Sequence, residues 1–242
     1  MSEARWPALR RLRAAMKADA RLQQRNGFYA AAAFVAVCMI PLLRRVSPDG
    51  LILLLPPLVL LNMQVNTFYF MGGLVLLEKA EGSLQALTVT PFRPAEYLTS
   101  KVATLALLSL VEAAVIVLAT HGPSVNWPAL AMGIGLTSLL LCLYGFIAVA
   151  RYDTVNAFLF PSMVYTAVVG LPVLDYFGVW AGPLWYAHPV RAPLILLEAA
   201  FHPVAAWQMA YAVGYGLLWS VGLGIIALRQ FDRHILRRQG DG

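Results

Sequence analysis

The sequence predicts an all-α polytopic membrane protein with six transmembrane helices. Hydrophobic residues make up 60% of its 242 residues and charged residues only 12%, whereas a typical soluble domain has about 25% charged residues. The mean hydropathy is +0.69. The apolar residues also form blocks near the roughly 20 residues needed to cross a bilayer. Because no polar segment between the blocks is long enough to fold alone, we expect residues 1–242 to form a single transmembrane domain.

Residues 1–27 precede the first apolar block, and their pattern predicts an amphipathic helix that lies in the membrane interface. Apolar side chains recur every three or four residues, which places them on one face of a helix. Bases occupy mainly the other faces, as in helices that bind anionic membrane surfaces. A solvated charged leader is the alternative, and nucleic-acid binding is disfavoured because the apolar face leads directly into a membrane span. The apolar positions are Trp6, Leu9, Leu12, Ala15 and Met16.

Six apolar blocks predict the membrane spans. The second span is long, and Pro56-Pro57 near its start is expected either to bend it or to end a short preceding turn, because proline removes a helical hydrogen bond. Residues 176–203, before the last span, are rich in Pro and aromatic residues. Their apolar run APLILLEAAF is too short to cross a bilayer, so we expect a re-entrant or interfacial segment on the outer side. The predicted spans are 28–46, 51–77, 98–120, 128–150, 154–175 and 204–228.

The basic residues predict the orientation, because Lys and Arg concentrate in the cytoplasmic loops of membrane proteins. With an even number of spans, all 18 Lys and Arg except Arg44, Arg45 and Arg191 lie on the side that holds both chain ends. We therefore expect both termini in the cytoplasm. Arg44 and Arg45 form an outer pair that this rule does not explain. The net charge of +6 is thus mainly a signal of topology.

Residues 78–97 interrupt the apolar pattern on the cytoplasmic side and predict a short surface helix between the second and third spans. Gly82 is suited to end the second span, and Ser83 is expected to be the N-cap of the short helix. A Thr-Pro and an Arg-Pro pair then break that helix, and the second proline begins the third span. Leu84 and Leu87 are apolar but lie outside the bilayer core. We therefore expect them to be exposed for a protein partner.

The stretch EKAEGSLQALTVTPFRPAEYLTSK, residues 78–101, resembles the signature segment of ABC-2 type transporter permeases. Those proteins have an acidic residue, Gly-Ser/Thr-Leu, a short helix, a Thr/Ser-Pro turn, and Glu-Tyr-Leu before the Lys that begins the next span. The resemblance covers nearly the whole chain, including the basic leader, the six spans and the broken hairpin before the last one. RNGFY and WYAHPVRAPLILLEAAF are similar to segments of the small actinobacterial permeases associated with fluoroquinolone and multidrug export.

The resemblance implies the permease subunit of an ATP-driven exporter in the bacterial cell membrane. Two permeases, identical or paralogous, pair with each other, and each binds a separate ABC ATPase through its leader helix and the segment after its second span. The complex moves an amphipathic drug-like or lipid-like compound out of the cell, which implies a role in multidrug efflux and antibiotic resistance. The ATPase-contact residues that it implies are Glu78, Glu81, Gly82, Ser83, Leu84, Leu87, Thr90, Pro91, Arg93 and Glu96.

The sequence contains no phosphate-binding loop of the form G-x-x-x-x-G-K-[ST], in which a Lys follows a Gly. Its lysines, Lys17, Lys79 and Lys101, follow Met, Glu and Ser. We therefore expect this chain to bind no cofactor, and the partner ATPase to bind ATP and Mg²⁺. Motifs for a nucleophile or a metal are also absent from the sequence, so we expect no catalytic residue and no metal site. The alternative functions are a membrane-embedded enzyme and a non-transporting membrane scaffold.

Glu112 lies 11 residues after Lys101, about 16 Å along a helix, and is expected near the middle of the membrane. Ionisable groups there usually face a bundle interior or a cavity. Two interpretations are open: a functional group that contacts a cationic or zwitterionic substrate or switches by protonation, and a protonated Glu bonded to a neighbouring helix. Asn62, Asn66 and Tyr69 are spaced by four and three residues on the second span. We expect one polar face there, in a substrate path or a permease interface.

Overall fold

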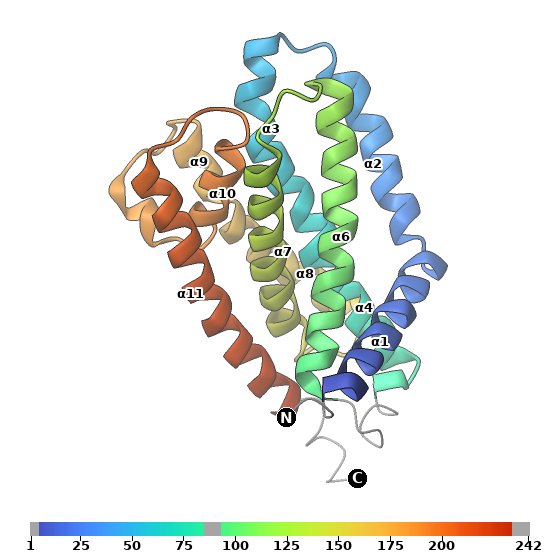
Figure 1. The fold of residues 1–242 in the computed structure, drawn as a ribbon. Coiled ribbons are helices and arrows are strands. Elements are labelled where there is room, and N and C mark those ends of the chain that lie inside the picture. The colour runs from blue at the N-terminus through green and yellow to red at the C-terminus, as the bar shows by residue number, and fades with distance from the viewer. Residues whose placement is uncertain (1–4, 85–92, 234–242) are drawn as a thin grey trace.

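The computed structural model describes residues 5–84 and 93–233, which form a bundle of helices (Figure 1). No strand occurs in these two ranges. The start of α1 and the end of α11, the first and last described helices, lie at the same end of the bundle (Figure 1). The elements are α1 (Arg5–Arg25), α2 (Phe28–Leu43), α3 (Pro48–Met63), η1 (Gln64–Tyr69), α4 (Phe70–Ala80), α6 (Pro94–Thr120), α7 (Trp127–Val149), α8 (Val155–Gly170), α9 (Pro172–Tyr176), η2 (Pro183–Ala187), α10 (Arg191–Glu198) and α11 (Ala206–Phe231).

The described helices include five stretches that are long and apolar enough to cross a membrane. α2 is long and apolar enough to cross a membrane only when the part of α1 from Leu9 is counted with it. The described residues therefore hold five or six candidate spans. All six predicted blocks coincide with helices to within a few residues at each end. The prediction of an all-α polytopic membrane protein is therefore confirmed. The five stretches are Pro48–Ala80, Pro94–Thr120, Trp127–Val149, Val155–Tyr176 and Ala206–Phe231.

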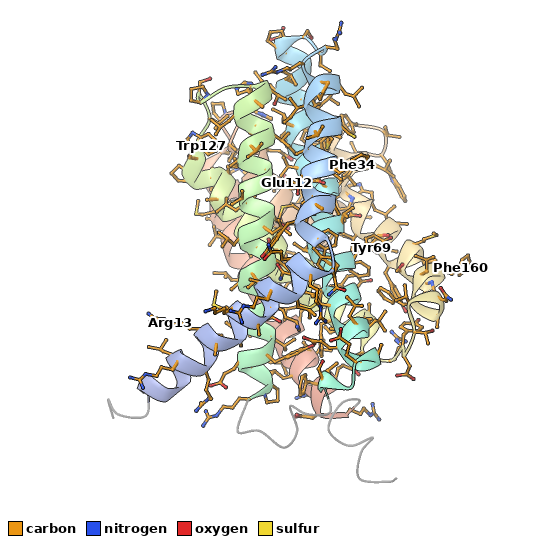
Figure 2. All side chains as sticks on the ribbon, turned by 90° about the vertical axis from the view of Figure 1, so that its right-hand side faces the viewer. Arg13, Phe34, Tyr69, Glu112, Trp127 and Phe160 are labelled. Carbon is orange, nitrogen blue, oxygen red and sulfur yellow. The ribbon has the colours of Figure 1, made fainter. Side chains whose placement is uncertain are left out.

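α1 and α2 meet at a bend of 61°. Gly27 makes this bend possible because its φ of +76° lies in the left-handed region, which residues with a side chain rarely adopt. α1 then packs against α6 and α2 and lies obliquely across the lower part of the bundle, with Arg13 on its protruding end (Figure 2). The helix predicted for residues 1–27 is therefore present from Arg5, and its place in a membrane interface stays a prediction.

The second span is continuous but contains a π-helical segment. α3 runs through Pro56 and Pro57, so these prolines do not end a short preceding turn. The irregularity lies at η1 instead, where the wider turn of a π-helix changes which way the following side chains point. η1 packs closely on α7, because a Cβ placed on Gly145 would lie only 2.9 Å from the carbonyl oxygen of Phe68.

α7 lies at the centre of the bundle and is the most buried of the five candidate spans. It packs against α6, α10, α11 and η1. The span formed by α8 and α9 is much less buried, because only 28% of its most apolar stretch is buried, against 72% for α7. A helix with so exposed an apolar surface requires lipid or another protein around it.

The segment between α8 and α11 folds back into the bundle. α10 packs against α3, α7 and α11, and its apolar residues 194–197 are buried. Arg191, at its start, pairs with Glu198 at 2.9 Å and with Asp175 at 3.3 Å. Burial raises the pKa of Glu198, while the guanidinium of Arg191 opposes that rise. The pair with Asp175 therefore attaches the start of α10 to α9, and the pair with Glu198 joins the two ends of α10 to each other.

Candidate functional site

A buried cluster of charges joins three helices near the end of the bundle where the described chain begins and ends. Lys101 of α6 is completely buried, and its Nζ lies 2.8 Å from Asp19 Oδ1 of α1 and 2.6 Å from Glu78 Oε1 of α4. The hydroxyl of Tyr97 donates to the other oxygen of Glu78 at 2.5 Å. The hydroxyl of Ser100 donates to the other oxygen of Asp19, also at 2.5 Å. All four carboxylate oxygens therefore have a hydrogen-bond partner.

The cluster consists of one base and two acids, and the protein compensates for burying them with directed hydrogen bonds. Charges taken out of water are tolerated only when paired and hydrogen-bonded. The ammonium of Lys101 also lies 4.5 Å from the centre of the Tyr97 ring, where a cation is attracted to the ring face. We call Asp19, Glu78, Tyr97, Ser100 and Lys101 the charge cluster.

Further polar contacts extend the attachment of α1 to α6 on both sides of the charge cluster. Gln23, one turn after Asp19, donates from its amide to Thr104 at 2.8 Å. Near the start of α1, the guanidinium of Arg11 pairs with Glu96 at 2.8 Å. Polar contacts to α6 therefore recur along α1, from Arg11 to Gln23.

Three acids predicted to contact the ATPase take part in ion pairs within this chain. Glu78 belongs to the charge cluster. Glu81 pairs with Arg25 at the end of α1. Glu96 binds Arg11 and also accepts the backbone N–H of Arg93 at 3.1 Å, which completes the start of α6. These carboxylates therefore hold α1 against the segment that was expected to receive the partner.

The turn after α4 has the predicted glycine but differs in two other respects. Gly82 has a φ of +69°, so the left-handed conformation at the helix end favours glycine there. Ser83 is not an N-cap, because it is already helical and its hydroxyl donates back to the carbonyl of Glu78 at 3.2 Å. The expectation that Leu84 is exposed is wrong, because it is 2% exposed and packs in the main core.

The structure leaves the role of the remaining residues of this prediction untested. Arg93 precedes α6 and is exposed. Leu87, Thr90 and Pro91 lie outside the described residues. The assignment of these positions to an ATPase contact therefore stays a prediction.

Glu112 lies deeper in the bundle, between α6 and α2 (Figure 2). It is 5% exposed, and the side-chain amide of Asn66 in η1 donates to its Oε2. Asn62 lies beside the same carboxylate. The structure thus brings together three of the four residues predicted for a substrate path or a permease interface.

Tyr69 separates from the other three, so the single polar face predicted on the second span is not present. Its hydroxyl forms a hydrogen bond with Thr166 of α8 at 3.0 Å, whereas Asn66 contacts Glu112 of α6. Asn66 and Tyr69 lie within η1, and a π-helix has more residues per turn than an α-helix. Residues three apart therefore do not share a face there, as they would in an α-helix.

Sequence reasoning did not assign a role to Asp19, Gln23 or Lys101. One signal was present: between residues 9 and 25, Asp19 is the single acid in a strongly basic helix. A single acid among the bases of a helix is explained when a base of the same chain pairs with it, as Lys101 does here. The partner itself, 82 residues later, could not be identified without the packing of α1 on α6.

The described residues contain no group of three or more His, Cys, Asp or Glu side chains arranged to hold a metal ion. Two of the three lysines have structural partners: Lys101 belongs to the charge cluster, and Lys79 donates to the backbone carbonyls of Ala150 and Tyr152. These arrangements stabilise the bundle.

Comparison with known proteins gives consistent matches over nearly the full length. The model of the fluoroquinolones export permease protein family matches residues 10–239. Two relatives, both named fluoroquinolones export permease proteins, come from Mycobacterium tuberculosis strains CDC 1551 / Oshkosh and ATCC 25618 / H37Rv. Each is 34% identical over 234 residues, which is 95% of this chain and 98% of the relative.

Proposed function

Because this chain belongs to the fluoroquinolones export permease protein family, we propose that it is the membrane-spanning subunit of an ATP-driven ABC exporter. A separate ATPase subunit hydrolyses ATP with Mg²⁺ on the cytoplasmic side of the bacterial cell membrane. The exporter moves an amphipathic, drug-like or lipid-like compound out of the cell, and the names of the relatives favour a fluoroquinolone-like drug. This chain forms the route of the compound across the membrane, and the ATPase subunit supplies the free energy of ATP hydrolysis.

The observation that carries this proposal is the charge cluster. It ties α1, the end of α4 and the start of α6 together at the same end of the bundle. A partner that pushes on α1 or on the segment after α4 therefore moves α6, which crosses the whole bundle (Figure 1). An ATPase bound there has a mechanical connection to the middle of the membrane.

A second permease completes the proposed transporter. α8 presents an apolar surface on which Phe160 is 77% exposed and Val164 is 56% exposed. Figure 2 shows Phe160 at the outer edge of the bundle, away from the other helices. This surface suits another copy of the chain or a paralogue, and both pairings fit the proposal.

Co-purification with candidate ABC ATPase subunits, followed by ATP-dependent uptake of a fluoroquinolone into inverted vesicles, tests the proposal. We expect a stable complex, ATPase activity stimulated by the drug, and uptake that requires both proteins. Charge reversal at Arg93, Arg93→Glu, is expected to weaken the complex because Arg93 is exposed on the proposed contact surface. The matched control is Arg45→Glu, which is exposed in the connection between α2 and α3, at the end of the bundle away from α1 (Figure 1).

Two outcomes would contradict the proposal. Drug movement by the purified chain alone, without any ATPase, would favour a different energy source. A chain that binds no ATPase subunit and moves no drug, but converts a lipid chemically, would favour a membrane-embedded enzyme.

A further inference from the structure

The bundle contains an apolar groove between α2 and α6, separate from the charge cluster. Its volume is about 570 Å³, within the range of sites that bind drug-sized molecules. Small side chains on α2, including Ala32, Ala33 and Ala36, leave this space open opposite Leu107 and Val111 of α6. The groove is therefore formed by residue size along two neighbouring helices.

The groove opens on the outer surface of the bundle. Val37 on its α2 side is 67% exposed, and Leu107 and Val111 on its α6 side are 59% and 54% exposed. These positions lie on candidate membrane-spanning helices. A compound dissolved in the bilayer thus reaches the groove sideways, without first crossing the protein.

Among the described residues that line the groove, Glu112 is the one acid, and none is basic. Glu112 is only 5% exposed. Asn66 donates to one carboxylate oxygen and Asn62 lies beside the carboxylate, while the other oxygen, Oε1, is buried and accepts no hydrogen bond of normal geometry from the described residues. No ion pair to Glu112 occurs within the described ranges either.

We infer that the groove between α2 and α6 is a binding site, entered from the bilayer, for an apolar molecule that carries a protonated amine, with Glu112 as its counter-charge. The amine supplies both the positive charge and the hydrogen-bond donor that Oε1 lacks. A lipid acyl chain fits the apolar walls but would leave that oxygen without a partner, which is costly in a buried site. The inference rests on the proposed export function, since it names the feature by which a substrate is recognised.

The test measures equilibrium binding of ciprofloxacin, which has a protonated terminal amine, to the full-length chain in lipid nanodiscs. Its N-acetyl derivative has the same aromatic body without that charge. We expect the wild-type chain to bind ciprofloxacin at least about tenfold more tightly than the derivative, because hydrogen bonds to charged groups are the strong ones. In Glu112→Gln, which keeps the size of the side chain and the amide contact, the two compounds are expected to bind equally weakly.

A second variant tests the location independently of charge. Ala33→Leu fills the groove from an exposed position on α2, and we expect binding of ciprofloxacin to weaken at least about tenfold. The matched control is Ala30→Leu, which is also exposed on α2 but does not line the groove. Wild-type affinity in Ala33→Leu, or in Glu112→Gln, would overturn the inference. So would equal binding of the two compounds by the wild-type chain, as an acyl-chain site predicts.

Export assays separate this inference from the proposed function. If the complex with its ATPase exports ciprofloxacin and Glu112→Gln exports it with unchanged apparent affinity, the groove is not the recognition site although the exporter function stands. If amine-selective binding requires Glu112 but no complex exports the drug, the binding site stands and the exporter function fails.

Discussion

Lys101 has to compensate two carboxylates at once, and this makes it the residue on which the attachment of α1 depends. Its ammonium contacts Asp19 and Glu78, and it is completely buried. Removing one partner from a buried ion pair is far more harmful than replacing the whole group, because a bare buried charge remains. A substitution that removes the charge of Lys101 therefore leaves two buried carboxylates without their counter-charge.

We predict that Lys101→Met destabilises the protein by about 3–5 kcal/mol, the range for buried pairs that lose one member. Methionine fills most of the same volume, so the loss reports the missing charge. Thermal unfolding of the purified chain in detergent measures the effect. Lys17→Met is the control, because Lys17 is exposed on α1 and surface changes usually stay within about 0.5 kcal/mol.

A combined variant distinguishes a charge effect from a packing effect. Lys101→Met with Asp19→Asn and Glu78→Gln removes all three charges of the charge cluster and should recover part of the lost stability. If the triple variant is less stable than Lys101→Met alone, unpaired charge is not the cause of the loss.

The sequence allowed the glycine at position 82 and the buried setting of Glu112 to be predicted, but not the partners of either acid in the charge cluster. A helical turn with φ of +69° selects Gly locally. The pairing of Lys101 with Asp19 and Glu78 joins residues far apart in the sequence, and no neighbouring residue type indicates it. Leu84 illustrates the opposite error, because an apolar residue outside the bilayer is exposed only if no helix of the same chain covers it.

Among the elements, η1 is the one whose geometry has the widest effect. Its π-helical turn directs Asn66 toward Glu112 and Tyr69 toward Thr166. It also lies so close to α7 that Gly145 contacts the backbone of Phe68. Without the wider turn, the second span would present Asn66 and Tyr69 on one face.

We predict that Gly145→Ala and Gly135→Ala change stability in opposite directions, although both lie on α7. A Cβ at position 145 would lie 2.9 Å from the Phe68 carbonyl oxygen and 3.1 Å from its Cα, so backbone has to move. We expect a loss of about 1–3 kcal/mol. At position 135 nothing lies within 4 Å, and alanine should stabilise the helix by about 0.5–1 kcal/mol.

Thermal unfolding of both variants in the same detergent provides the measurement. Equal stability of Gly145→Ala and the wild-type chain would mean that η1 and α7 are not in close backbone contact. The helices themselves were predictable because apolar blocks of the required length leave few alternatives in a membrane. The π-helical turn was not, since no pattern of residue types distinguishes it from an α-helix within a uniformly apolar span.

For the whole molecule, the shared position of the chain ends agrees with an even number of crossings. α1 and α11 reach the same end of the bundle (Figure 1), and the distribution of Lys and Arg predicts that this end is cytoplasmic. Geometry alone does not assign the side, because the bundle has the same shape in either orientation. The assignment depends on the charges in the sequence.

We predict that a membrane-impermeant maleimide labels Ser124→Cys in intact cells but labels Lys17→Cys only after permeabilisation. Ser124 is exposed in the connection between α6 and α7, and Lys17 is exposed on α1. Both variants are made in a background with Cys38 and Cys142 replaced by Ala. The reverse labelling pattern would place the termini outside and would contradict an ATPase contact at α1.

The contact between Asp19 and Lys101 also has a consequence for how the chain is made. The two residues are 82 positions apart, so Asp19 leaves the ribosome long before its partner exists. At about 5–20 residues per second, translation of that interval takes roughly 4–16 s. During this time α1 has no Lys101 to pair with, so its docking against α6 has to wait until the third span has been made.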